Sequence, residues 1–396
     1  MRILWVVTKP PWPPIDGGRV VIATTLAALR ARGHDIDLVA PYDPDGAAPD
    51  EVVRSLTHLC RAHLIPVRQR PALASALATL RTRAPLAIAR HDVAAVRAAV
   101  TTLLDEQAFD VVHTEQLQAL AQCAGARTRG VPVVLRCQNV ESDLWRGWAR
   151  RGTSLGALAR IEAARLAAFE GRALRGVSAV TALTADDAAR LTALAGGDVR
   201  VAHIAAPYPA ELPAGPALGG GRPRVAVLGS AGWQPNRDGI DWLAREAWPR
   251  IRAQLPDARL HVFGGDHEGT SRDAVIAHAA PADSAVAFPA DAICVVPLRY
   301  GSGVRMRILE AWARGVPVVA TPQAVHGLDV ESGRELLVAW TADELAAALR
   351  TLDEDASLRA AVIDAGRARL RAAHDPDLVA ARLEQLYRRA ADRAPH

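Results

Sequence analysis

The chain has 396 residues, of which 50% are hydrophobic and 23% charged, and its formal net charge is +4. This composition excludes a disordered chain, and the length predicts two or three domains with proper hydrophobic cores. A charge of this size gives no nucleic-acid signature, so we expect no nucleic-acid partner.

The N-terminus and the cysteines indicate the compartment. Arg2 is followed directly by a short apolar strand, without a signal peptide or a span of about 20 apolar residues. The four cysteines are scattered through apolar segments, at Cys60, Cys123, Cys137 and Cys294. Their spacing fits neither a zinc site nor a disulfide framework, and we expect reduced, buried thiols in a cytoplasmic protein.

The first 40 residues predict the opening of a doubly wound α/β fold. An apolar strand at residues 3–7 leads through a Pro/Gly-rich loop to a helix over residues 20–32, and a second strand follows Gly33. In the loop, Gly17 and Gly18 permit close backbone approach to a ligand. Arg19 is either a phosphate or acceptor contact or simply the first exposed residue of the helix. A merely structural loop is the alternative.

Polar residues then follow two predicted strands, at residues 110–113 and 131–136. Parallel strands carry their ligands at their carboxyl ends, so this edge is a candidate acceptor site. The polar residues singled out there are His113, Glu115, Gln138, Asn139 and Glu141. For the histidine, a satisfied structural role is the commoner alternative.

The pattern of the first 40 residues is repeated at residues 224–264, with a predicted helix over residues 239–254. The two copies predict tandem Rossmann-like domains, with a boundary in the Pro/Gly-rich segment 207–223. Asp375 and Pro376 are suited to begin a final amphipathic helix. We therefore expect domains at residues 1–206 and 207–374, and a C-terminal helix in residues 375–396.

The most informative segment runs from Cys294 to Thr321. A buried strand, the turn Gly301-Ser302-Gly303, a short helix starting just after Gly303 and a second buried strand predict a phosphate site, because bare N–H groups and the positive end of a helix face the ligand. The residues predicted to hold a diphosphate are Gly301, Ser302, Gly303 and Val304 through their backbone, with charge from Arg299 and Arg305. Glu310, among apolar neighbours, is suited to accept hydrogen bonds from a ribose or sugar diol.

This segment resembles the GT-B glycosyltransferases, in particular retaining family 4, whose lineage pattern matches Pro297 to Thr321 almost throughout, with Arg307 in a lysine position. The resemblance implies a cleft between two Rossmann-like domains, onto the first of which the last helix crosses back. It also implies transfer of a sugar from a nucleoside diphosphate to an acceptor, in surface polysaccharide, glycolipid or secondary-metabolite glycosylation, with no metal and no cofactor. Gly17 and Gly18 would then line the donor phosphates.

Three features depart from the family pattern. The usual Arg and Lys of the second domain's first loop, residues 229–239, are not clearly present, and Arg237 is the candidate substitute for binding the diphosphate. Gln138 replaces a histidine near the reacting sugar, and an amide cannot accept a proton at neutral pH. Ser302 replaces the glutamate that many relatives use to hold the donor sugar. We therefore assign Gln138 and Glu310 to the catalytic centre, and an inactive sugar-nucleotide binder or partner subunit is the alternative. We also expect that Glu310→Ala would abolish transfer without affecting folding, as for an exposed cleft carboxylate.

Two further features concern membrane contact and metal binding. Arginines between residues 146 and 175 share a segment with Trp145 and Trp148, so peripheral membrane contact is possible beside the commoner solvated helix. The acidic pairs at residues 35–37 and 43–45 fit a metal pattern, but they fall within and just after a strand, and no metal site is expected.

Overall fold

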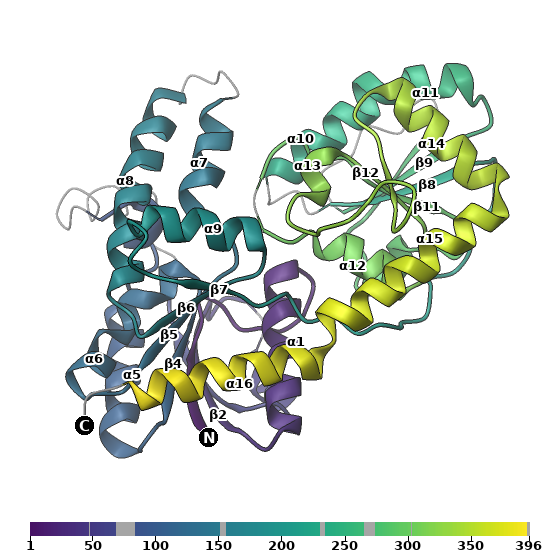
Figure 1. Cartoon of the computed structure of the whole chain (residues 1–396). Helices are drawn as coiled ribbons and strands as arrows, with labels where there is room; N and C mark the ends of the chain where they lie inside the picture. The colour runs from purple at the N-terminus through teal and green to yellow at the C-terminus, as the bar shows by residue number, and fades with distance from the viewer. Residues whose placement is uncertain are drawn as a thin grey trace. The chain divides into compact units, whose positions relative to one another are not determined.

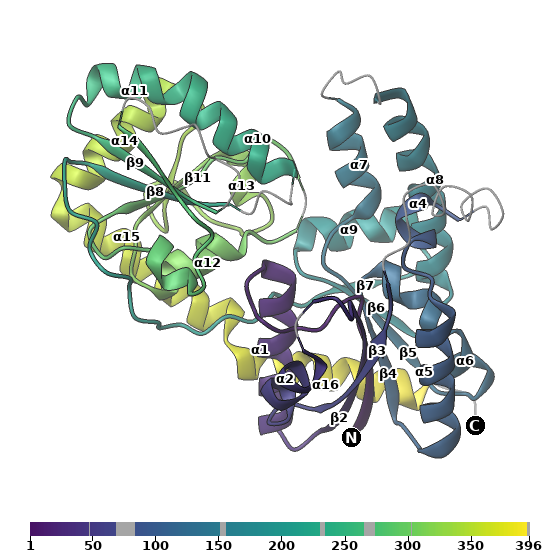
Figure 2. The same ribbon diagram turned by 180° about the vertical axis from the view of Figure 1, so that it is seen from behind.

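The computed structural model describes residues 1–46, 48–68, 84–150, 156–229, 234–264, 274–301 and 303–393. It divides into two compact units (Figures 1 and 2). The first comprises Met1–Pro14, Gly18–Ala206 and Pro376–His396, and the second comprises Ile15–Gly17 and Pro207–Asp375.

The first unit is built on a seven-stranded, wholly parallel sheet in the order β3-β2-β1-β4-β5-β6-β7. Its strands are β1 (Arg2–Val6), β2 (Asp35–Tyr42), β3 (Arg61–Pro66), β4 (Val111–Glu115), β5 (Val133–Cys137), β6 (Ala179–Ala182) and β7 (Val201–His203). Helices cover both faces, as buried parallel strands require. They are α1 (Gly17–Ala31), α2 (Pro49–Leu56), α4 (Leu86–Ala89), α5 (Ala94–Glu106), η1 (Leu117–Cys123), α6 (Ala124–Thr128), α7 (Glu141–Ala149), α8 (Gly156–Arg175), α9 (Ala185–Leu194) and α16 (Pro376–Asp392).

Alternate residues of these strands feed two cores. Ile3 and Trp5 of β1 pack with α1, α2 and α16 on one face, whereas Leu4 and Val6 pack with α5 and η1 on the other. The last helix contributes the fully buried Leu383 to the first of these cores. The chain therefore returns to its first unit after completing the second.

The second unit repeats this architecture with six parallel strands in the order β10-β9-β8-β11-β12-β13. The strands are β8 (Arg224–Leu228), β9 (Arg259–Phe263), β10 (Val275–His278), β11 (Ile293–Val296), β12 (Val318–Ala320) and β13 (Leu337–Val338). The helices and helical turns are α10 (Gln234–Trp242), η2 (Leu243–Ala247), α11 (Trp248–Gln254), η3 (Ser284–Ala287), α12 (Met306–Ala313), α13 (Pro322–Val325), α14 (Ala342–Glu354), α15 (Ala356–Arg369) and η4 (Leu370–His374).

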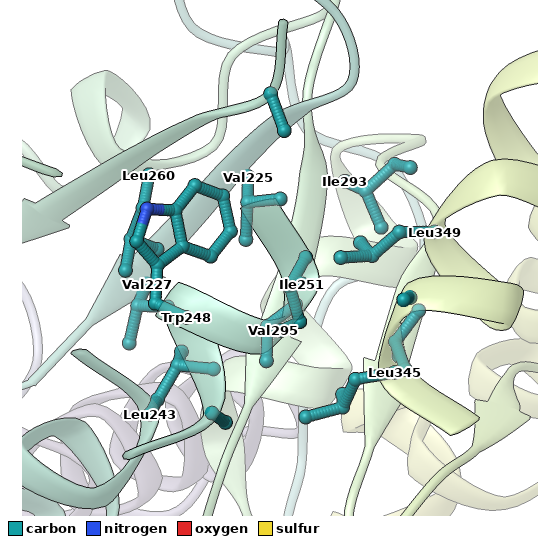
Figure 3. Close-up of a cluster of buried hydrophobic side chains, with 14 of the residues drawn as sticks. Val225, Val227, Leu243, Trp248, Ile251, Leu260, Ile293, Val295, Leu345 and Leu349 are labelled. Carbon is teal, nitrogen blue, oxygen red and sulfur yellow. The ribbon is translucent and has the colours of Figure 1, made fainter. Parts of the chain in front are cut away.

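One face of the second sheet carries a core centred on Trp248 (Figure 3). Val225 and Val227 of β8 meet Leu345 and Leu349 of α14 there, and all are almost fully buried. Burying each side chain of this size contributes roughly 1.5–3 kcal/mol, so this layer holds the sheet that carries the glycine turn.

The two doubly wound sheets confirm the fold class expected from the sequence. The start of the first helix differs from the expected one. Gly17 and Gly18 are the first residues of α1 rather than part of the preceding loop, and neither has a positive φ. Their expected place in the preceding loop is therefore wrong, although a helix start still presents backbone N–H groups.

Candidate active site

In each sheet the strand order reverses once, between β1 and β4 in the first and between β8 and β11 in the second. Ligands of open parallel sheets bind outside the carboxyl ends of the strands at such a reversal. The glycine turn follows β11, and three predicted site residues, Gln138, Asn139 and Glu141, follow β5, the second strand beyond the reversal of the first sheet. The topology therefore places each group of candidates at or beside the reversal of its own sheet.

The conformation of the glycine turn is fixed by its own backbone and by the side chains of Thr321, just after β12, and Gln323 in α13. Gly301 and Gly303 have φ angles of 133° and 81°, which side-chain-bearing residues rarely adopt. The hydroxyl of Thr321 donates to the Leu298 carbonyl, and Gln323 Nε2 donates to the Gly301 carbonyl at 3.0 Å. Ser302 lies outside the described residues.

The helix after the turn begins later than expected. Arg305 occupies the position before the first helical residue, Met306, so Val304 and Arg305 extend the turn. Arg305 is buried, and half-buried Arg307 donates to Asn236 Oδ1 at 3.2 Å. Burial lowers the pKa of Arg307. Two guanidinium groups thus flank the start of α12.

The other two predicted arginines differ in their surroundings. Arg237 is exposed on α10. The guanidinium of Arg299 lies 5.6 Å from the Trp242 ring and 6.0 Å from the Trp340 ring, in a cavity of about 230 Å³. Such cation–π stacking engages the charge. We therefore assign Arg299 to the support of the segment before the turn rather than to the diphosphate.

Glu310 is held within a buried polar cluster. Its Oε1 accepts hydrogen bonds from Arg314 Nε at 3.0 Å and from Ser284 Oγ at 2.5 Å. Glu310 is only 9% exposed. The burial of Tyr208, together with the nearby charge of Glu310, raises the pKa of the Tyr208 hydroxyl. The expectation of an exposed carboxylate whose loss costs no stability is therefore wrong.

In the first unit, Glu115 is the centre of a buried network. Arg136 donates to its carboxylate at 2.7–3.0 Å, Gln138 Nε2 donates to Oε1 at 2.8 Å, and His113 Nε2 lies 3.3 Å from Oε2. Burial acts to raise the pKa of Glu115, but Arg136 and His113 outweigh it and lower the pKa to about 2. The carboxylate is therefore permanently charged.

His113 is fully enclosed by aromatic side chains. Its ring stacks on Trp5 with 3.7 Å between centroids, and its Nδ1 lies 2.8 Å from the Tyr387 hydroxyl. Burial lowers its pKa to about 4, so the imidazole is neutral at pH 7. His113 and Glu115 were expected at an exposed strand end, but they lie inside β4 and present no surface to an acceptor. The structural alternative holds for this histidine.

Gln116 connects this network to Thr8, just after β1, and is not among the site residues singled out from the sequence. Its Nε2 donates to Gln138 Oε1 at 3.1 Å, and its Oε1 accepts from Thr8 Oγ1 at 3.2 Å. Its backbone has φ 69° and ψ 152°, a region that is almost restricted to glycine. Strain of this kind is concentrated at functional sites, and no residue type or spacing in the sequence signals it.

The remaining acceptor-side candidates lie around the start of α7. Asn139 is half-buried in the loop before it, and Glu141 is its first residue. The carboxylate of Glu170 accepts from the backbone N–H of Glu141 at 2.7 Å. Burial first, and then the charge of Glu170, raises the pKa of Glu141 to about 7. Arg19, half-buried on α1, donates to the Pro13 carbonyl at 3.4 Å.

The surroundings of the cysteines and of Asp37 indicate structural roles. All four cysteines are free and buried, and burial raises the pKa of Cys294 to about 12. Asp37 is buried and pairs with Arg61 and His63, at 2.9 Å in each case. Within the described ranges, no three His, Cys, Asp or Glu residues are grouped to hold a metal ion.

Comparisons with known families agree with this architecture. Residues 16–207 match the glycosyl transferase 4-like domain, and residues 222–355 match the domain called glycosyl transferases group 1. The chain belongs to the GT-B glycosyltransferases. No match was found among curated proteins.

Solved structures share the fold over almost the whole chain. A sucrose-phosphate synthase from Thermosynechococcus elongatus is 18% identical, with a TM-score of 0.71 and 98% of both chains covered. Anabaena HepE, solved with UDP, is 15% identical with a TM-score of 0.64, covering 98% of this chain and 99% of HepE. A variant of S. aureus TarM, solved with fondaparinux, alpha-GlcNAc-glycerol and UDP, is 10% identical with a TM-score of 0.68, covering 98% and 100%.

One further property concerns membranes. Among the helices of the described ranges, none is both long and apolar enough to cross a bilayer.

Proposed function

We propose that this protein transfers a sugar from a nucleoside-diphosphate donor to an acceptor, with retention of configuration. The observation that carries the proposal is the glycine turn at the strand-order reversal of the second sheet. It leads through Val304 and Arg305 into α12, which carries Arg307 in its first turn. Backbone N–H groups, a helix start and guanidinium groups together form a diphosphate site.

In this proposal the turn stabilises the departing nucleoside diphosphate. The backbone N–H groups of Gly301, Gly303 and Val304 and the guanidinium groups of Arg305 and Arg307 are in place before the reaction, so little reorganisation is needed as negative charge develops on the leaving group. Glu310 holds a hydroxyl pair of the donor. Neither a metal nor a cofactor is required for this chemistry.

Gln138 then serves positioning rather than proton transfer. Its amide is fixed by Glu115 and Gln116, which sets its orientation without any ionisation of its own. The acceptor hydroxyl is thus deprotonated by a group other than Gln138, and we assign this step to the departing phosphate, which lies next to the reacting sugar.

A thermal-shift panel tests the donor site. HepE was solved with UDP and with UDP-glucose, so UDP is the first nucleotide of a panel that also contains GDP, ADP and dTDP. At about 100 times the dissociation constant, one nucleotide should stabilise the protein by roughly 2.7 kcal/mol. Sugar transfer is then measured as release of that nucleotide from its sugar conjugate. A chain that binds none of the four would contradict the proposal.

Gln138 also favours a second candidate function, a sugar-nucleotide binder without transferase activity. The two functions differ in one measurement. A protein that binds the nucleotide sugar but releases no nucleotide over hours, with a broad set of acceptors, would be the binder. Replacement by the family residue, Gln138→His, should raise turnover only if a proton acceptor is missing.

We also propose peripheral membrane contact through the antiparallel pair α7 and α8 (Figures 1 and 2). Leu158 and Ile161 are each 59% exposed on α8, and exposed Arg160 lies between them. Apolar side chains beside arginines suit an anionic lipid surface. Co-sedimentation with vesicles of 30% phosphatidylserine tests this contact, and Leu158→Asp with Ile161→Asp should abolish it.

A further inference from the structure

The first unit contains a cavity of about 420 Å³ at the carboxyl ends of its first strands. Thr8 and Lys9 line it just after β1, Tyr42 and Asp43 line it at the end of β2, and His91 lines it between α4 and α5. A volume of 300–1,000 Å³ is typical of small-molecule sites. The cavity lies wholly within the first unit and away from the glycine turn in the chain.

Positive charge predominates in the cavity wall. Four cationic side chains line it, Lys9, Arg19, Arg68 and Arg90, against the single carboxylate of Asp43. Lys9 is the only lysine in the chain. Burial lowers the pKa of His91, and the charges of Arg90 and Lys9 lower it further. Such a cluster is stabilised by an anion.

The rest of the wall is apolar and aromatic. Trp12, Tyr42, Val52, Val93 and Val96 all line it. Aromatic and aliphatic walls with a few charged groups orient a ligand that has one charged end and one apolar body. A free inorganic ion would leave this apolar surface unused.

The cavity is connected to the network around Gln138. Thr8, a residue of the wall, donates to Gln116, and Gln116 donates to Gln138. Thus a ligand in the cavity lies two hydrogen bonds from the residue that we assign to the catalytic centre. The strained backbone of Gln116 forms this bridge.

We propose that the cavity binds the acceptor, and that this acceptor carries a phosphate or carboxylate group attached to an apolar or aromatic body. Lys9 and Arg90 bind the anionic group, while Trp12 and Tyr42 contact the body. The role of this ligand as an acceptor rests on the proposed function, but its binding can be measured without any sugar transfer.

Direct binding tests the proposal on the full chain by isothermal titration calorimetry. Phenyl phosphate and phenylacetate are the anionic probes, and benzyl alcohol is the neutral probe of similar shape. We expect saturable binding of at least one anion. Benzyl alcohol should bind at least about tenfold more weakly than that anion. The stronger of the two anions identifies the acceptor's charged group as phosphate or carboxylate.

Matched variants then locate the probe. Lys9→Gln and Arg90→Gln should each weaken the anion by about tenfold or more, the loss of one charge-assisted hydrogen bond. Arg54→Gln removes an exposed arginine of α2 that does not line the cavity, and it should leave the affinity unchanged. Melting temperatures within a few degrees of the parent show that the variants fold.

UDP separates this inference from the proposed function. If UDP stabilises the protein but neither anion binds, or if all three arginine and lysine variants weaken the anion equally, the acceptor proposal is overturned while the donor site stands. If UDP competes with the anionic probe for one site, the cavity belongs to the donor and the proposal is also overturned. Binding of both ligands together, with anion binding sensitive to Lys9 and Arg90, supports it.

Discussion

The hydroxyl of Tyr387 lies 2.8 Å from Nδ1 of His113, although 274 positions separate the two residues. Tyr387 belongs to α16, and His113 belongs to β4 at the centre of the first sheet. Both side chains are fully buried. This contact gives the last helix a specific polar attachment in addition to its apolar packing.

Removal of that attachment should destabilise the first unit. Tyr387→Phe keeps the ring but leaves a buried nitrogen of His113 without its partner, and this costs about 1–3 kcal/mol of the free energy of unfolding. Urea denaturation measures the change. Tyr42→Phe is the control, because the Tyr42 hydroxyl makes no hydrogen bond within the described residues. An equal effect of the two variants would contradict the role of the contact.

Acid should weaken the fold through His113. Its folded pKa of about 4 lies below the ordinary value of 6.5, so the unfolded chain binds the proton first. The stabilisation is complete above pH 6.5 and is lost as the pH falls toward 4, by roughly 3 kcal/mol. We expect the stability difference between the parent and His113→Asn to shrink by this order between pH 7.5 and 4. A difference independent of pH would refute the assignment.

Glu141 should change the pH dependence of stability in the opposite direction to His113, because folding raises its pKa instead of lowering it. Its folded pKa of about 7 lies above the ordinary 4.5, so the buried carboxyl opposes folding increasingly as the pH rises from 4.5 to 7. Glu141→Gln should therefore stabilise the protein by up to roughly 3 kcal/mol at pH 8 and have little effect at pH 4. Thermal denaturation at both values, with the exposed Glu106→Gln as control, measures this. Stabilisation of equal size at both pH values would rule it out.

Gln116 allows backbone strain and hydrogen bonding to be separated. Gln116→Gly and Gln116→Ala both lose the bonds to Thr8 and Gln138, but only glycine accepts φ 69° and ψ 152° without strain. Glycine should therefore be the more stable variant by about 1–2 kcal/mol, the reverse of the usual order. Both should lose transfer by about tenfold. If alanine is the more stable of the two, the strain is absent.

Glu310 requires two variants, because the residue is both buried and assigned to the donor. Glu310→Ala removes the buried partner of Arg314, whose other carboxylate, exposed Asp283, is 4.0 Å away, and should cost about 3–5 kcal/mol. Glu310→Gln can still accept from Ser284 and should fold, with UDP affinity reduced about tenfold by the weaker acceptor. Calorimetry with UDP measures this, and the exposed Glu354→Gln is the control. Unchanged UDP affinity in Glu310→Gln would remove Glu310 from the donor site.

The sequence by itself determined the two doubly wound sheets, the position of the glycine turn and the start of the last helix at Pro376. These features are local: a strand covered on both faces reads as a continuous apolar run, and glycine and proline mark where the chain must turn. Gly301 and Gly303 indeed have positive φ angles. The segment from Pro297 to Thr321, which carries the family resemblance, is local in the sequence as well.

Only the tertiary structure decided what the charged and polar side chains do. Arg299 lies beside the Trp242 and Trp340 rings, Glu310 pairs with Arg314 and Ser284, and His113 contacts Trp5 and Tyr387. Most of these partners are tens or hundreds of positions away in the chain. A carboxylate, guanidinium or imidazole takes its pKa and its role from whatever packing brings near it, and spacing along the chain does not contain that information.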